Sequence, residues 1–128
     1  PKEYGRNGLN VRRDWYEKYP NASLALVAAS LEGQNAIWTN TDKAIDVFMN
    51  WAQISDRAQA EKAVRDFMKY GRRDMRWNRD GWDLTKQVLA SQNPAIESVD
   101  VTKAYTLGPL DKLRDMGFYQ SLGIPIGR

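Results

Sequence analysis

The residues best suited to chemistry lie in one basic segment, Lys69–Arg79. It places five cations and two aromatic residues within eleven positions. Basic side chains interleaved with aromatic rings can follow the phosphates of a nucleic acid and stack on its bases. An arginine fork can instead bind the carboxylate or sulfonate of a small solute, for which Arg76 and Trp77 are the candidate ligand-binding residues. A third interpretation is a solvated helix connector, partly neutralised by Asp74 and Asp80, and the mixture of signs favours it.

The composition removes most routes to catalysis. The 128 residues include no cysteine and no histidine. Thiolate catalysis, disulfides, Cys-type zinc sites and the commonest general base are therefore excluded. Asp111 and Asp115 share one face of a predicted helix, but without a histidine or a second carboxylate cluster we interpret them as a solvated surface. No glycine-rich phosphate loop, nucleophile elbow or metal-ligand spacing is present. We predict a non-enzymatic protein without metal or cofactor.

The aromatic content indicates a folded chain. Apolar residues make up 42% of the sequence, which contains five tryptophans, whereas disordered segments are poor in aromatic residues. Trp38, Trp51 and Trp82 lie at helical spacing among apolar residues, so we predict that they pack in the core. Trp15 and Trp77 lie near helix breaks, where one of them can line a solute pocket. The net charge of +3 is only a weak indication of acidic partners.

The apolar residues recur with a helical period through nearly all of the chain. The pattern predicts a mainly α fold of about five or six helices and at most one short strand, over residues 1–128 as one domain or as a fragment of a larger protein. The strand would be Gly8–Val11, and because a single strand needs a partner, its sheet would lie elsewhere. The expected helices are a short turn over residues 13–18, a long helix from Pro20 to about Thr39, one that starts at Thr41, one between Ser55 and Gly71, one that starts at Asn78 or Asp80 and ends before Asn93, and a last one through Leu110, Leu113 and Met116.

Helix ends are predicted from capping residues. Thr41 and Ser55 are the expected N-caps of two helices, and Gly71 is the expected C-terminal stop. Near the end of the chain, Gly117 and Gly123 are expected to stop the last two helical turns. The other expectations are an Asp100 cap on a short turn, an inward face of Trp82, Thr85, Val88 and Leu89, and another of Leu110, Leu113 and Met116.

The order and spacing of these segments resemble the C-terminal part of periplasmic substrate-binding proteins of the nitrate, sulfonate and taurine importer type. Gly8–Pro20 resembles the last strand of the second lobe and the small helix after it. Asn21–Asn40 and Thr41–Ile45 resemble the next two helix segments, and Val99–Pro125 resembles the closing segment. The resemblance implies a two-lobed α/β fold (type II periplasmic binding protein), of which this chain would supply the C-terminal helical part.

The resemblance also implies a function. Such receptors close two lobes on a solute and then dock on the permease of an ABC importer. It implies a periplasmic or extracytoplasmic location, a small anionic or organic solute bound together with the missing lobe, and no nucleic-acid partner. The alternative function is a helical interaction or nucleic-acid-binding module that uses Lys69–Arg79.

The behaviour of the chain by itself follows from the same resemblance. Because the first residue is Pro1, we expect a processed chain or a fragment. Most ligand residues of the family would lie outside it, so we expect no tight solute binding by these 128 residues alone. We also expect self-association through faces that the missing lobe would cover.

Overall fold

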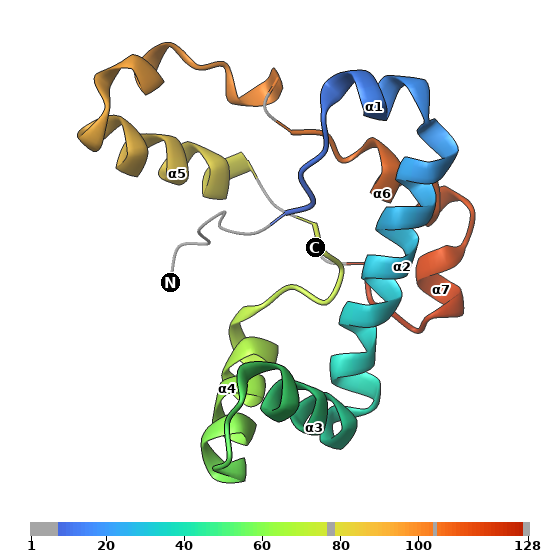
Figure 1. Ribbon diagram of the computed structural model, residues 1–128. Helices are drawn as coiled ribbons and strands as arrows, with labels where there is room; N and C mark the ends of the chain where they lie inside the picture. The colour runs from blue at the N-terminus through green and yellow to red at the C-terminus, as the bar shows by residue number, and fades with distance from the viewer. Residues whose placement is uncertain (1–7, 77–78, 104, 127–128) are drawn as a thin grey trace.

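The computed structural model describes residues 8–76, 79–103 and 105–126 of the chain (Figure 1). These residues form seven α-helices and two 3₁₀ helices without a strand, which confirms the mainly α class. The predicted strand Gly8–Val11 has no regular secondary structure. The elements are α1 Arg13–Lys18, α2 Pro20–Thr39, α3 Thr41–Ala52, α4 Arg57–Tyr70, α5 Arg79–Gln92, η1 Pro94–Ser98, η2 Val101–Lys103, α6 Gly108–Asp115 and α7 Phe118–Ser121.

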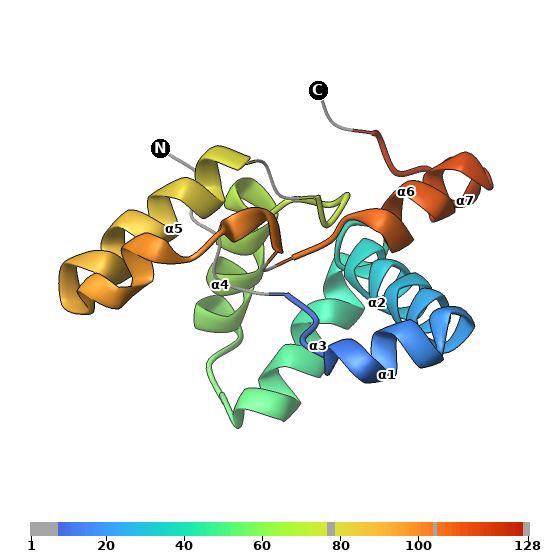
Figure 2. The same ribbon diagram turned by 90° about the horizontal axis from the view of Figure 1, so that it is seen from above.

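The long helix α2 connects the two packed regions of the molecule. Helices α1 and α6 pack against it in one region, and α3 and α4 pack against it in the other. Figure 1 shows α1 at one end of the molecule and the α3–α4 pair at the opposite end. Figure 2 shows α5 and α7 on opposite sides. Helix α5 lies apart from these helices with η1 and η2 as its neighbours, and we call α5, η1 and η2 the arm.

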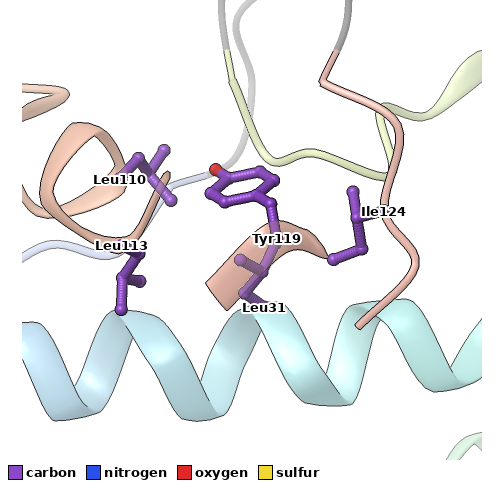
Figure 3. Packing of buried hydrophobic residues seen from close by; sticks show 5 residues of the cluster. All are labelled: Leu31, Leu110, Leu113, Tyr119 and Ile124. Atoms are coloured by element: carbon purple, nitrogen blue, oxygen red, sulfur yellow. The ribbon is translucent and has the colours of Figure 1, made fainter. Parts of the chain in front are cut away.

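The first core joins α2 to the end of the chain. Leu31 of α2 is fully buried against Leu110 and Leu113 of α6, Tyr119 of α7 and Ile124 (Figure 3). The inward positions of Leu110 and Leu113 are confirmed. The prediction for Met116 was wrong, because α6 ends at Asp115 and this side chain is 66% exposed.

The second core lies between α3 and α4. Its buried residues are Ile45 of α3 with Ala60 and Val64 of α4. Trp51 of α3 was predicted to join this core and does not, since its side chain is 79% exposed. The apolar residues of α3 span a wider arc than one neighbouring helix covers.

Two predicted N-caps were wrong by one residue. The α4 cap is Asp56 and not Ser55, and its carboxylate accepts hydrogen bonds from the backbone N–H groups of Ala58 and Gln59. Asn40 precedes α3, while the hydroxyl of Thr41 donates to the carbonyl of Ile37 over 2.9 Å. The short break between α2 and α3 leaves that carbonyl within reach of Thr41.

The predicted helix stops at Gly117 and Gly123 and the predicted cap at Asp100 are confirmed. Gly117 and Gly123 adopt the left-handed conformation expected at helix stops, and Asp100 caps η2 by accepting from the N–H of Thr102. Gly71 also follows the last residue of α4, but with an extended backbone. Glycine fits there for another reason, because a Cβ would lie 2.6 Å from the carbonyl oxygen of Phe67.

The predicted inward face of α5 is only partly buried. Thr85 is buried, and Trp82 stacks on Tyr105 with ring centroids 4.9 Å apart. Val88 and Leu89 are 40% and 42% exposed. Only the short helices η1 and η2 pack on α5 among the described elements, and they cover too little of its surface.

Two glycine substitutions test the packing around α2 and at the end of α4. Gly33→Ala in α2 places a methyl group where nothing lies within 4 Å, so stability should rise by about 0.5–1 kcal/mol. Gly71→Ala should instead cost about 1–3 kcal/mol, because the backbone at Phe67 must move. Urea unfolding of both variants measures the two effects, and a Gly71→Ala variant as stable as the parent would contradict this account.

Candidate functional site

We call helices α1–α4, α6 and α7 the body. A broad hollow of about 1400 Å³ opens between the body and the arm. Its walls come from the segment that starts at Gly8, from α1 and α2, and from the connector that follows α4. The far side is formed by the start of α5 and by residues 102–110. The site therefore brings together segments that lie far apart in the sequence.

Aromatic rings line much of this hollow. They belong to Trp15, Tyr16, Phe67, Tyr70, Trp82 and Tyr105. Of these, Trp82 and Tyr105 stack on each other, with 8° between their ring planes. Concave sites with aromatic walls and a few polar groups are typical of small-molecule binding.

The charged residues of the hollow are mostly basic. Arg13, Arg72 and Lys103 line it, and Glu17 is the one carboxylate among the described lining residues. Asp74, which is buried behind the lining, pairs with Arg72. Lys103 also has a carboxylate beside it, since its Nζ lies 3.8 Å from Oδ2 of Asp100. The charges of the lining are therefore close to balanced, and Arg13 at the rim is the cation best placed to hold an anionic group.

One hydrogen bond ties the body to the arm at the rim of the hollow. Nη2 of Arg13 in α1 donates to the backbone carbonyl of Lys103 in η2 over 2.9 Å. The charge of an arginine strengthens such a bond. This contact keeps η2 close to α1 and sets the width of the hollow at that point.

The basic segment forms a tightly bonded connector. Nε of Arg73 donates to Oδ1 of Asn35 over 2.6 Å, and Nδ2 of Asn35 donates to the carbonyl of Leu122 over 3.1 Å. Nη2 of Arg76 lies 2.6 Å from Oδ1 of Asp111 in α6. These two arginines therefore hold α2, α6 and the end of the chain together.

The buried carboxylate of Asp74 organises the turn of this connector. It accepts from Nε and Nη2 of Arg72 over 3.1 and 3.0 Å, and from the backbone N–H of Arg76 over 3.0 Å. The next residue, Met75, has a φ of 55°, a left-handed conformation that non-glycine residues seldom adopt. The hydroxyl of Tyr119 donates to the carbonyl of Asp74 over 2.9 Å and closes the network.

Burial and charge shift two pKa values in this network. Desolvation raises the pKa of Tyr119 above its ordinary value, although the nearby Arg76 guanidinium opposes the shift. Desolvation lowers the pKa of Arg76, but the hydrogen bond and the charge of Asp111 outweigh it and raise that pKa overall. Tyr119 therefore stays neutral and Arg76 stays charged over a wide range of pH.

Of the two predicted site residues, the structure describes only Arg76. Arg76 does not line the hollow and is paired with Asp111, so its guanidinium is used inside the protein. Trp77 lies outside the described residues. Asp111, predicted to lie on a solvated face, has a 42% exposed side chain and also accepts from both Arg76 and Arg114.

Most residues that line the hollow were not predicted from the sequence. Trp15 does line the hollow, as its position near a helix break allowed. Tyr16, Tyr105 and Lys103 were not singled out, because nothing in their local sequence indicates that residues about ninety positions apart meet.

Comparisons with known proteins give no further guide. No protein-family model, no curated protein and no solved structure matches this chain. Within the described ranges, no helix is long and apolar enough to cross a membrane. The same ranges contain no group of three or more acidic residues placed to hold a metal ion. The geometry of the hollow therefore supplies the functional argument.

The Tyr119 hydroxyl is a direct test of the connector network. Tyr119→Phe should lower the free energy of unfolding by about 1–2 kcal/mol, because the carbonyl of Asp74 loses its donor in a buried place. Tyr70→Phe is the matched control, since Tyr70 is 65% exposed. Equal urea midpoints for the two variants would show that the bond contributes nothing.

The raised pKa of Tyr119 also predicts a loss of stability in alkali. Between the unfolded pKa of about 10 and the higher folded value, the native state binds more protons, so stability falls as the pH rises. Lys62, whose hydrogen bond to Asp66 raises its pKa, acts in the same direction. Urea unfolding from about pH 9 to 11 should therefore show a shallower decline for Tyr119→Phe than for the parent, and parallel curves would exclude a contribution from Tyr119.

Proposed function

We propose that this chain is the C-terminal part of the solute-binding receptor of an ABC import system, with no enzymatic activity. The observation that carries the proposal is the hollow, whose aromatic walls and the Arg13 guanidinium at its rim suit a small anionic or organic solute. The resemblance of the ordered segments to such receptors supports the same function. The permease in the membrane would be its second partner, and the location would be periplasmic or extracytoplasmic.

The open side of the hollow fits a receptor that binds with two lobes. Gly8–Val11 lies at the edge of the hollow, and its side chains Leu9 and Val11 are 45% and 44% exposed. An apolar segment of this kind gains stability when a neighbouring strand or lobe covers it. Closure of the second lobe over the solute would remove both the hollow and this edge from water.

The solute contacts proposed here differ from the sequence prediction. Arg76 is replaced by Arg13, whose guanidinium lies at the rim, and by the ring of Trp15 on the same helix. A guanidinium supplies the charge that an anion requires, and a ring supplies a flat apolar contact. Both groups come from α1, so a small movement of this helix would shift them together.

A nucleic-acid function finds little support in the same contacts. Arg72, Arg73 and Arg76, the middle cations of the basic segment, make hydrogen bonds to acceptors inside the protein. Phosphate contact would require breaking those bonds. If this chain is instead a nucleic-acid-binding module, its binding to single-stranded DNA must weaken steeply with salt. The receptor proposal predicts no such binding.

The gene and its full product test the receptor function. The reading frame should continue upstream of the Pro1 codon and encode a signal peptide and an α/β lobe. In that product, Trp15→Ala should weaken the binding of taurine, nitrate or the cognate solute at least about tenfold in calorimetry, as expected for a stacked ring. Met116→Ala, which alters an exposed residue outside the hollow, is the control. A start codon directly before Pro1 would contradict the proposal.

A further inference from the structure

Helix α3 presents an uncovered apolar face to solvent. Val47 and Trp51 are 55% and 79% exposed, and residues four apart lie on the same side of a helix. Trp51 has the highest exposed fraction among the large apolar side chains of the described residues. Ile45, on the opposite side of the helix, is fully buried against α4. The helix therefore has one apolar side in the core and another without a neighbour.

A lysine completes this face. Lys43 lies four residues before Val47 and is exposed. It takes part in none of the ion pairs recorded among the described residues. The neighbouring acids Asp42 and Asp46 pair with Arg57 instead, at 3.5 and 2.5 Å. We call Lys43, Val47 and Trp51 the α3 face.

We infer that a second copy of this chain packs on the α3 face, with the two α3 helices antiparallel about a two-fold axis at Val47. Each residue of a helix advances about 100° around its axis. Lys43 and Trp51 thus lie about 40° to opposite sides of Val47, one turn before it and one turn after it. These three residues form a row inclined by about 26° to the helix axis, so the rows of two copies run parallel when the helices cross at about 50°. A two-fold axis perpendicular to this row at Val47 turns the row end for end, so Lys43 of each copy meets Trp51 of the other.

This arrangement uses every group on the face. Val47 packs on Val47 of the second copy, and each lysine lies over a tryptophan ring, a favourable cation–π contact. The symmetry repeats that contact twice, as expected for a self-complementary patch. A different apolar partner would cover Val47 and Trp51 but would leave Lys43 without a matching group.

The contact is distinct from the proposed solute site. None of the three residues lines the hollow, and Figure 1 places α3 at the opposite end of the molecule from α1. One helix face per copy is smaller than the standard interface of about 800 Å² per partner. The dimer is therefore weak and depends on concentration.

Sedimentation equilibrium of the 128-residue chain tests the association. The parent should dimerise as its concentration rises from about 10 μM to 1 mM, the range of a weak interface. Val47→Glu should weaken the dimer at least tenfold, because two carboxylates would meet at the axis. Leu26→Glu is the matched control, since Leu26 is 40% exposed and lines the hollow.

The outcomes separate the two surfaces. A parent that stays monomeric throughout overturns the inference. A dimer that survives Val47→Glu but not Leu26→Glu places self-association at the hollow and also overturns it. Circular dichroism of each variant confirms that loss of the dimer is not loss of the fold.

A cysteine placed at the axis gives an independent test. The chain has no cysteine of its own, so Val47→Cys supplies one thiol per copy. With oxidised glutathione as the oxidant, Val47→Cys should form a disulfide dimer at least tenfold faster than Ser91→Cys, an exposed control on α5. Equal rates for the two variants would exclude an axis at Val47.

Discussion

The fold depends on one buried charge, the carboxylate of Asp74. A buried carboxylate is costly unless its oxygens are hydrogen-bonded, and this one accepts from the Arg72 side chain and the Arg76 backbone. Those bonds hold the turn after α4 in a shape that places Met75 in the left-handed region. The same turn directs the carbonyl of Asp74 toward Tyr119. One charge thus joins the middle of the chain to its end.

The hollow owes its shape to this connector. Arg72 and Met75 form part of the lining, and α5 begins a few residues later. The body side is thereby fixed by a bonded network, whereas a hydrogen bond from Arg13 to Lys103 holds the arm side at its rim. The body side of the hollow is therefore held by more hydrogen bonds than the arm side.

The sequence predicted local structure well and long-range partners poorly. Helix positions follow from the apolar period and from residues such as Gly117, whose effects act within a few positions. The role of Arg76 depends on Asp111, 35 residues away, and an arginine that binds a ligand has the same local sequence as one that binds an aspartate. Trp51 shows the same limit, because periodicity predicts that a face is apolar but not whether a neighbouring element covers it.

Two uncovered apolar faces remain, and their surroundings distinguish them. On α5, Val88 and Leu89 are half-exposed, but nothing beside them indicates what would cover them. On α3, Arg57 pairs with the nearby acids, and Lys43 and Trp51 lie one turn to either side of Val47. A face that carries both a cation and an aromatic ring, at equal spacing about Val47, is complementary to itself. The self-association expected from the sequence thus has a defined location on α3, which would leave the hollow free for a solute.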